Sequence, residues 1–269
     1  MKIFKHYRNL YKPVQPTVKG SFSGVSYNEI PTTGKIENFV YCFWELKTDQ
    51  PLTNPFVYRV VADGCIDIFF EKESPKESFI MGFCRKYTEF ELGKNFNYIG
   101  IRFFPSVFPL FFGINAKKLS NISQELKLIL PGLSHWITEN IPENFLFEKT
   151  AVEMQFFFES LSVRLQNTYD ERFLKALELI YEKKGLLNIE SDIDTGVSPR
   201  QLRRIFNYYI GTTPKVFSNV VRFQNILNEI ENKNFDDFRT YYDLGFFDQT
   251  HFIKDFKKFY GVTPSRAFQ

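Results

Sequence analysis

The chain has 269 residues, of which 43% are hydrophobic and 24% are charged. At roughly 150 residues per domain this length indicates two domains, and the apolar content is sufficient for a core in each. The formal net charge of +3 is close to neutral, so composition alone does not indicate a nucleic-acid partner.

Cysteine usage and hydropathy disfavour two classes of protein, secreted proteins and membrane proteins. The three cysteines, Cys42, Cys65 and Cys84, are odd in number and lack metal-ligand spacing, which indicates free thiols in a reducing compartment. Residues 1–13 are basic and aromatic and lack the apolar centre of a secretion signal. The most apolar window, residues 99–114, contains an arginine and two prolines, so it is not expected to span a membrane. We therefore expect a cytoplasmic protein with no membrane partner.

Residues 14–103 are expected to form strands separated by turns. Runs rich in Val, Ile, Phe, Tyr and Trp alternate with Gly, Pro, Asn and Asp, a pattern typical of a sheet-rich domain or small barrel. An extended segment around Val25 and Tyr27 precedes expected strands at residues 38–46, 55–61, 65–70, 78–83, 87–92 and 98–103. Asp63-Gly64 is predicted to form a tight turn. A short helix is expected after Pro105, and residues 119–130 are a further helix candidate.

Residues 150–165 are predicted to form an amphipathic helix between the two halves. Its apolar positions recur at nearly helical spacing, at Val152, Phe156, Phe157, Leu161 and Leu165. Such a helix either packs on its own sheet or pairs with a second copy of the chain. A second amphipathic helix is predicted from Glu171 to Lys184, with Gly185 at its end. We place the domain boundary near Asp170.

Residues 196–269 repeat one pattern twice. Gly211-Thr212-Thr213-Pro214 and Gly261-Val262-Thr263-Pro264 stand fifty residues apart, and a phenylalanine stands five residues before the glycine in each copy. Repetition at this period indicates one supersecondary unit used twice. Each copy is predicted to be a helix-turn-helix, and residues 214–231 are predicted to form the long helix that joins them.

Each repeat predicts a helix with one apolar and one polar face. In the first, Ser198 is a good N-cap, Pro199 fits the first helical position, and the helix ends near Tyr209. Its apolar face is Leu202, Ile205, Phe206 and Tyr209, and its outer positions are Arg200, Gln201, Arg203, Arg204 and Asn207. The second helix is capped by Phe247 or Asp248. Its outer positions are Gln249, Thr250, His251, Lys254, Lys257 and Lys258.

The charge pattern of the first repeat favours a polyanionic partner. No Asp or Glu occurs from residue 195 to residue 228, whereas five Lys and Arg residues do. A surface without carboxylates suits nucleic acid. A lone amphipathic helix with basic residues outside is more often only a solvated face, so the repetition is what favours binding.

The repeated region resembles the DNA-binding domain of AraC-type transcription regulators over roughly residues 170–269. Residues 245–264 follow the family pattern G-F-x-[DS]-x-[ST]-x-F-x-[RK]-x-F-K-[KR]-x-x-G-x-[ST]-P, and the first unit matches through residues 198–206, Gly211 and Arg222. The resemblance implies two helix-turn-helix units that bind duplex DNA. The candidate DNA contacts are Ser198, Arg200, Gln201, Arg203, Arg204, Arg222, Gln249, Thr250, His251, Lys254 and Lys257.

The candidates divide by their place on the helices. Base edges are assigned to Arg200, Gln201, Arg204, Gln249, Thr250 and His251. Lys254, Lys257 and Arg222 lie farther along their helices and are assigned to phosphate or structural contacts. Two departures from the family affect the supporting helices: Ser191-Asp192 replaces Leu-Ala, and Thr240-Tyr241 replaces Ile-Ala. We expect the first supporting helix to be irregular and the second unit to repack around the larger side chain.

The N-terminal half resembles the N-terminal domain of one AraC-type subgroup. The resemblance lies in Phe43-Trp44, in Asp63-Gly64-Cys65-Ile66-Asp67, and in Gly100-Ile101-Arg102-Phe103 with Pro105. It implies a cupin-like sensor or dimerisation domain, with Trp44, Asp63 and Arg102 as candidate ligand contacts. Each has a plainer alternative: Asp63 belongs to a turn, Arg102 is a buried ion-pair partner, and the aromatic residues are ordinary core.

Catalysis is not expected. The three histidines, His6, His135 and His251, are widely separated, and neither H-x-H, H-E-x-x-H, C-x-x-C, G-x-S-x-G nor a P-loop occurs. The cysteines lie in apolar runs, where thiols are usually inert. We therefore expect no catalytic residue, no cofactor and no metal site.

Together these observations predict an α+β chain with three parts. Residues 1–141 are a sheet-rich sensor or dimerisation domain, cupin-like or a small barrel. Residues 142–169 are a helical bridge, and residues 170–269 are an all-α domain with two helix-turn-helix units. The expected function is a sequence-specific, effector-responsive transcription regulator. The alternative is a constitutive DNA-binding protein whose N-terminal domain is a scaffold or protein-interaction module. Duplex DNA is the expected partner, and RNA polymerase, a small-molecule effector and a second copy of the chain are further candidates.

Overall fold

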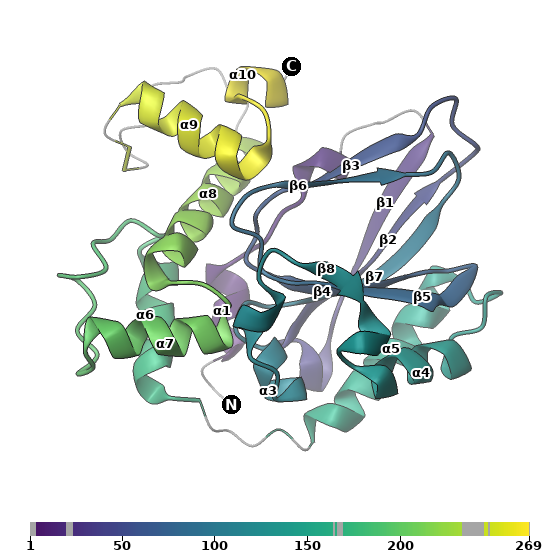
Figure 1. Cartoon of the computed structure of the whole chain (residues 1–269), viewed down its shortest axis with the longest axis horizontal. Coiled ribbons are helices and arrows are strands. Elements are labelled where there is room, and N and C mark those ends of the chain that lie inside the picture. Colours follow the sequence, from purple (N-terminus) through teal and green to yellow (C-terminus); the bar gives the residue numbers. More distant parts are fainter. Residues whose placement is uncertain are drawn as a thin grey trace.

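A sheet-rich N-terminal domain and a helical C-terminal region lie side by side in the computed structural model (Figure 1), which describes residues 4–19, 24–163, 165, 169–232, 245, 246 and 248–268. The expected α+β class is therefore confirmed. The strands are β1 (Val25–Pro31), β2 (Val40–Thr48), β3 (Phe56–Val60), β4 (Ile66–Glu71), β5 (Ser74–Met81), β6 (Thr88–Leu92), β7 (Asn97–Phe103) and β8 (Ser123–Glu125).

The strands form one large sheet and one separate ribbon. The six-stranded sheet has the order β1-β2-β7-β4-β5-β8, and β3 pairs only with β6. All of these pairings are antiparallel. Because β3 and β4 belong to different layers, the turn at Asp63-Gly64 carries the chain from the ribbon to the sheet and does not close a hairpin.

Alternation along the strands separates two apolar cores. On β2, Trp44 and Leu46 face the space between the sheet and the ribbon, where they pack with Tyr58 and Val60 of β3. Phe43, the neighbour of Trp44, is buried in the other core on the opposite face of the sheet. A period of two residues is what a pleated strand requires, and both faces of β2 are apolar because both are covered.

Helices cover the second face of the sheet. They are α3 (Phe108–Phe112), α4 (Pro131–Asn140) and α5 (Phe147–Ser162), with short 3-10 turns η1 (Gly34–Ile36), η2 (Ala116–Leu119) and η3 (Leu126–Leu128). The ring of Phe103 on β7 meets Phe158 of α5 edge to face, with ring centroids 5.5 Å apart. The predicted bridge helix thus begins at Phe147 and packs on its own sheet.

The helix predicted at residues 119–130 is wrong. The segment instead forms the end of η2, then β8 and η3. β8 joins the edge of the sheet, where the amide of Gly82 donates to the carbonyl of Ile122 at 3.1 Å. The helix begins only at Pro131, whose fixed φ and missing N–H suit a first helical position. Strand β5 also begins earlier than expected, at Ser74, because β4 and β5 form a close hairpin.

The C-terminal region confirms most of the predicted helices. They are α6 (Glu171–Glu182), α7 (Pro199–Tyr209), α8 (Pro214–Asn232), α9 (Gln249–Tyr260) and α10 (Pro264–Ala267). Residues 186–198 contain turns and no helix, so the segment departs further from a helix than the irregularity expected from Ser191-Asp192. Asp192 closes one of these turns by accepting a hydrogen bond from the amide of Asn188 at 2.8 Å. The expected repacking around Thr240-Tyr241 lies outside the described residues.

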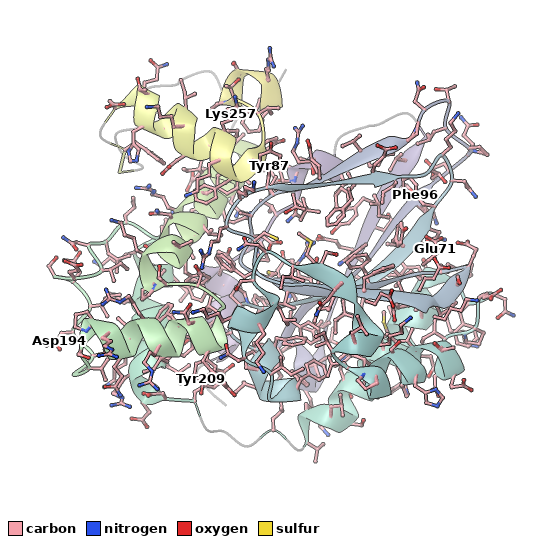
Figure 2. The ribbon with its side chains drawn as sticks, viewed as in Figure 1. Glu71, Tyr87, Phe96, Asp194, Tyr209 and Lys257 are labelled. Carbon is pink, nitrogen blue, oxygen red and sulfur yellow. The ribbon has the colours of Figure 1, made fainter. Side chains whose placement is uncertain are left out.

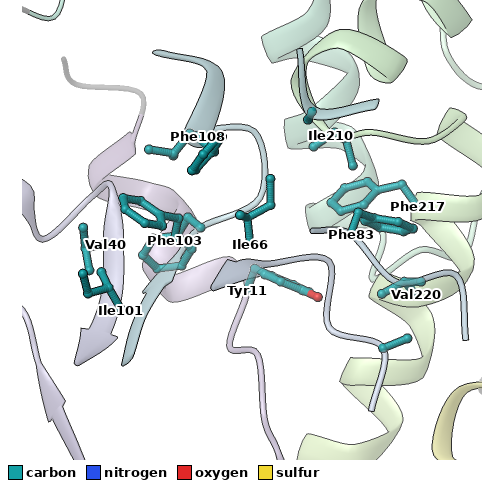
Figure 3. Close-up of a cluster of buried hydrophobic side chains, with 14 of the residues drawn as sticks. Tyr11, Val40, Ile66, Phe83, Ile101, Phe103, Phe108, Ile210, Phe217 and Val220 are labelled. Carbon is teal, nitrogen blue, oxygen red and sulfur yellow. The ribbon is translucent and has the colours of Figure 1, made fainter. Parts of the chain in front are cut away.

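A segment near the N-terminus lies between the two regions. It contains α1 (Phe4–Leu10) and α2 (Pro16–Lys19), and residues 4–19 are called the strap below. The ring of Tyr11 stacks on Tyr181 of α6, with centroids 4.9 Å apart. Figure 3 shows the result, a single cluster that runs from Phe103 and Ile66 in the sheet through Tyr11 and Phe83 to Phe217 of α8. Among the described helices, none combines the length and apolar character needed to cross a membrane.

Candidate nucleic-acid interface and cavity

Helix α7 presents a polar first turn to solvent. The side chain of Ser198 accepts a hydrogen bond from the amide of Gln201 at 3.3 Å and so caps the helix. Leu202 and Phe206 are buried against the neighbouring helices. Four candidate side chains are therefore exposed on the outer face: Arg200, Gln201, Arg203 and Arg204.

Helix α9 repeats this arrangement. Asp248 is the N-cap, and its carboxylate accepts from the amide of His251 at 2.7 Å. Phe252 and Phe256 are buried. The exposed candidates are Gln249, Thr250, His251, Lys254 and Lys257. Figure 2 shows Lys257 on the outer side of this helix.

Arg222 lies in a different environment from the other candidates. Its guanidinium contacts the carboxylate of Asp255 on α9 at 3.2 Å and donates to the carbonyl of Gly245 at 3.2 Å. It also lies over the ring of Phe246, 4.2 Å from the centroid. Burial lowers the pKa of Arg222, and Asp255 opposes that shift. With its side chain only 13% exposed, Arg222 joins α8 to α9, which supports the structural option for this residue.

Helix α8 holds the two polar turns apart. Figure 1 shows α7 and α9 at opposite ends of α8. The 19 residues of α8 span about 28 Å at about 1.5 Å per residue. The chain has the left-handed glycine conformation after both outer helices, with φ of 96° at Gly211 and 103° at Gly261. The outer helices of the two repeats are thus both followed by a left-handed glycine, and they lie at the two ends of α8.

The N-terminal domain holds both outer helices at their C-terminal ends. The hydroxyl of Ser120 donates to the carbonyl of Gly211 beyond α7. The amide of Tyr87 donates to the carbonyl of Lys258 at 3.2 Å, and the amide of Ala62 donates to that of Phe259 at 3.2 Å. Figure 2 shows Tyr87 beside this end of α9. The N-terminal turns, which carry the polar candidates, point away from the domain (Figure 1).

Residues 61–65, called the junction loop below, contact both regions. The carbonyl of Ala62 accepts from the side-chain amide of Gln224 on α8 at 2.9 Å. The backbone of Val61 exchanges two hydrogen bonds with the buried side chain of Gln15 in the strap, at 2.9 and 3.0 Å. Gly64 packs so closely on Phe217 that an added Cβ atom would lie 3.1 Å from the ring.

Arg102 is fully buried and is paired with carboxylates. Its guanidinium lies 3.0 Å from Asp67, 3.4 Å from Glu29 and 3.5 Å from Asp63. Burial raises the pKa of Asp67 to about 6, although Arg102 opposes the shift. Of the two alternatives raised by the sequence, the contacts support the ion-pair partner for Arg102. Asp63 links this cluster to the junction loop.

A cavity of about 390 Å³ lies between the large sheet and the β3–β6 ribbon. Of the three candidate ligand contacts, Trp44 lines it, whereas Asp63 and Arg102 do not. The remaining lining residues are Leu46, Tyr58, Val60, Asp67, Phe69, Phe79, Met81, Glu89, Phe90, Glu91, Leu92, Tyr98 and Ser123. Figure 2 shows Phe96 in the same interior, where its ring lies 6.2 Å from that of Tyr98. Alternation along β2 and β4 places Trp44, Leu46, Asp67 and Phe69 on this side of the sheet, but the sequence does not show which strands face one another.

The described residues do not offer a metal centre. No group of three or more His, Cys, Asp or Glu side chains among them is placed to hold a metal ion. Cys42, Cys65 and Cys84 are free and buried, and burial raises the pKa of each thiol. Such thiols are poor nucleophiles and poor metal ligands.

Two families match separate parts of the chain. Residues 28–125 match a family described as a domain of unknown function (DUF6597). Residues 194–269 match a family described as a helix-turn-helix domain, and they include α7, α8 and α9. A search of the curated proteins finds none that matches this chain.

Solved structures of ToxT from Vibrio cholerae are similar to this chain at 11% identity. For ToxT from strain O395 the match covers 91% of this chain and 97% of that one, with a TM-score of 0.39. For the same protein bound to (E)-4-(8-methylnaphthalen-1-yl)but-3-enoic acid, the shares are 91% and 98% and the TM-score is 0.40. For unsaturated fatty acid bound wild-type ToxT from strain SCE256, they are 92% and 95%, with 0.39.

Proposed function

We propose that the chain is a DNA-binding regulator of the AraC type that binds a single asymmetric DNA site through α7 and α9, because residues 194–269 match a helix-turn-helix domain. The observation that carries this proposal is the pair of capped, solvent-exposed polar turns at the two ends of α8. The N-terminal turn of a recognition helix is the part that meets base edges in the major groove.

In this proposal the two helices enter successive segments of the major groove, roughly one turn or about 34 Å apart. Base edges are read by Arg200, Gln201 and Arg204 from α7, and by Gln249, Thr250 and His251 from α9. Arginine pairs with guanine and glutamine with adenine in that groove. Ser198, Arg203, Lys254 and Lys257 contact the phosphate backbone, which fixes the register of the protein on the duplex.

Selection of bound DNA from a random pool tests the proposal. The full chain is expected to enrich one asymmetric site with two short conserved blocks about one turn apart. If only one conserved block of base pairs is enriched, only one of the two helix-turn-helix units recognises the DNA sequence. If no sequence is enriched above the input pool, the proposed sequence-specific binding is wrong.

We further propose that the N-terminal domain adjusts DNA binding in response to an effector. The junction loop supports this, because it connects the Arg102 cluster beside the cavity to α8 and α9. The alternative is a constitutive DNA-binding protein with an N-terminal scaffold. Repeating the selection with and without cell metabolites separates the two, because DNA affinity changes only in the first case.

The exposed face of α5 supports a second copy of the chain as a partner. Phe156 and Val163 are 63% and 72% exposed and lie two turns apart on one side of the helix. Large exposed side chains in a row are typical of an interface. We propose that this face joins two copies, that the assembled regulator meets RNA polymerase at its promoter, and that the protein acts in the cytoplasm.

The division of the chain also remains a proposal. We assign residues 1–141 to the sensor or dimerisation domain, residues 142–169 to the bridge and residues 170–269 to the DNA-binding domain. The strap belongs to the first part by sequence, yet it packs on α6 and α8 of the third. Limited proteolysis that cuts first between residues 163 and 170 would support this boundary.

A further inference from the structure

We propose that the cavity between the sheet and the β3–β6 ribbon takes a ligand with an ammonium group on an apolar body. The inference rests on the effector response proposed above and names the class of effector. It depends on three features of the cavity wall: the sign of its charges, its aromatic rings and its size.

The charged residues of the wall are all acidic. They are Asp67, Glu89 and Glu91, and none of the described lining residues is Lys, Arg or His. Arg102 lies behind the wall, fully buried, and its guanidinium contacts three carboxylates. A ligand carboxylate would therefore lose its water without gaining a cationic partner, which is strongly unfavourable.

Asp67 is the acidic group that meets the ligand in this proposal. It stands on β4 beside Phe69, and its side chain is 12% exposed. Within the described part of the chain its ion-pair partner is Arg102, which Asp67 shares with Asp63 and Glu29, so one positive charge faces three negative ones. This surplus favours the approach of a further cation. Glu89 is held by Arg59 at 2.7 Å and is therefore the weaker candidate.

Aromatic rings surround Asp67 within the wall. The ring of Phe69 lies 6.0 Å from that of Trp44 and 6.1 Å from that of Tyr98, which it meets edge to face. Tyr58 and Phe90 close the cavity from the ribbon. The faces of such rings attract ammonium groups through their electrostatic quadrupole. Carboxylate and rings together match an organic cation better than a metal ion.

The volume limits the size of the ligand. A cavity of about 390 Å³ is near the lower end of the range of roughly 300–1,000 Å³ typical of small-molecule sites. It suits an amine with one aromatic ring or a short alkyl chain. The guanidinium of Arg102, 3.0 Å from Asp67, favours the ionised form of this carboxylate, which is the form that pairs with an ammonium group.

Three probes that share a phenylpropyl group test the sign of the preferred charge. Phenylpropylamine, phenylpropanol and phenylbutyrate carry an ammonium, a hydroxyl and a carboxylate on the same body. Calorimetric titration of the full chain is expected to show the amine binding at least about tenfold tighter than the alcohol, a difference of about 1.4 kcal/mol. The carboxylate is expected to bind most weakly. Equal or tighter binding of the carboxylate, or no binding of any probe, overturns the inference.

Variants locate the binding. Asp67→Asn is expected to remove most of the preference for the amine over the alcohol. Because this change also removes a partner of Arg102, Tyr98→Leu is a second variant that keeps every charge and weakens the amine more than the alcohol. Glu77→Gln, which changes an exposed carboxylate on the outer part of β5, is the matched control and should leave all three affinities unchanged. An unchanged amine preference in both wall variants places the amine elsewhere and contradicts the proposal.

DNA binding is measured separately, without any probe. If the chain selects no DNA site while the amine binds as expected, the proposed function fails and the cavity inference stands. If the site is selected but none of the probes binds, only the cavity inference fails. If both are seen and the amine leaves DNA affinity unchanged, the cavity binds amines without acting as the effector site.

Discussion

Gln224 is a glutamine with no exposed surface, and the buried Val220, Val221 and Leu227 lie one turn away from it on α8. Its amide accepts from the backbone N–H of Val14 at 2.7 Å and donates to the carbonyls of Ala62 at 2.9 Å and Val14 at 3.3 Å. One side chain thereby satisfies the backbone of both the strap and the junction loop. A buried polar group of this kind is costly unless all of its partners are present.

Replacing Gln224 with leucine is expected to destabilise the chain. The change leaves a buried backbone N–H and at least one carbonyl without this partner, at a cost of roughly 1–3 kcal/mol for each orphaned group. Chemical unfolding of the purified chain measures the loss. Lys215→Leu, at an exposed position of the same helix, is the control and should stay within about 0.5 kcal/mol of the parent. Similar stabilities for the two variants would show that water replaces the glutamine.

Glu71 makes the stability of the sheet depend on pH. Burial, reinforced by a hydrogen bond with Glu73, raises the pKa of Glu71 from 4.5 to about 8, while the amide of Asn97 favours the ionised form. The folded state therefore binds a proton more tightly than the unfolded state. This group's stabilising effect is complete below pH 4.5 and is lost as the pH rises through 8.

Glu71→Gln removes that dependence and retains an acceptor for the amide of Asn97. The variant is expected to gain melting temperature relative to the parent as the pH is raised from below 4.5 to above 8. Melting scans across this interval provide the measurement, with Glu139→Gln at an exposed position of α4 as the control. If the melting temperatures of the parent and of Glu71→Gln change with pH in the same way, Glu71 does not bind its proton more tightly in the folded state.

Single residues also show where prediction from sequence stops. Ser198, Asp248, Gly211 and Gly261 were predictable because caps and left-handed glycines act within one turn of the chain. The cavity wall was not, apart from Trp44. It depends on strand register, which places Asp67 opposite Arg102 across two strands far apart in sequence. No local pattern reports such a pairing.

At the scale of elements, two adjacent phenylalanines of α5 have different environments, although the sequence pattern assigned both to one apolar face. Phe157 stacks on Trp136 of α4 with ring centroids 4.0 Å apart, whereas the adjacent Phe156 is 63% exposed. The apolar spacing in the sequence placed both on one face. The buried face uses Thr150, Ala151 and Met154 together with Phe158; of these, only Phe158 belonged to the apolar face predicted from the sequence.

Two glutamate substitutions on α5 are expected to act differently. Phe157→Glu should lower the melting temperature, because the loss of a packed aromatic side chain costs roughly 1.5–3 kcal/mol. Phe156→Glu should leave the melting temperature of the single chain nearly unchanged and lower the sedimenting mass. A mass that is the same for the parent and for Phe156→Glu would remove α5 as the contact between copies.

Substitutions at different positions along the two outer helices are expected to have different effects on DNA binding. Arg200→Ala, in the first turn of α7, should relax the preference at one or two base pairs and cost about 1–3 kcal/mol at the preferred site. Lys254→Ala, farther along α9, should weaken all sequences alike and reduce the salt dependence by about one unit of slope. Site profiles at fixed salt distinguish them. If the site profile of Arg200→Ala is identical to that of the parent, α7 does not contribute to sequence recognition through Arg200.

Elements were predicted well where the signals were local and poorly at the edge of the sheet. The polar pair Ser191-Asp192 predicted an irregular first supporting helix, and the structure has turns and no helix there. β8 was missed because a three-residue edge strand depends on its partner β5, and its flanking leucines imitate a helical period.

At the scale of the whole molecule, the sheet, the strap and α8 share one apolar core, so a change in one region is transmitted to the others by packing. Gly64 is one point of close approach between the junction loop and α8. It has a positive φ of 75°, and a methyl group there would press on Phe217 of α8.

Gly64→Ala is therefore expected to change DNA affinity as well as stability. The left-handed conformation alone costs an alanine roughly 1–2 kcal/mol. Gly113→Ala is the matched control, because Gly113 has a φ of 65° and no atom within 4 Å of its added Cβ. Both variants should melt lower, but only Gly64→Ala should shift the DNA dissociation constant. Equal DNA affinities would show that the junction loop does not influence α8.

The bond between Val14 and Gln224 joins residues 210 positions apart, and this has a consequence for biosynthesis. At roughly 5–20 residues per second, a ribosome needs about 10–40 s to add α8 after the strap has been made. During that interval Val14 of the strap lacks its partner Gln224. Tyr11 lacks its partner Tyr181 until α6 has been made. The arrangement of the sheet relative to the polar turns is thus settled only after α8 has been made. A nascent chain that stalls before α8 would leave the strap and the junction loop without their partner Gln224, and so open to chaperones and proteases.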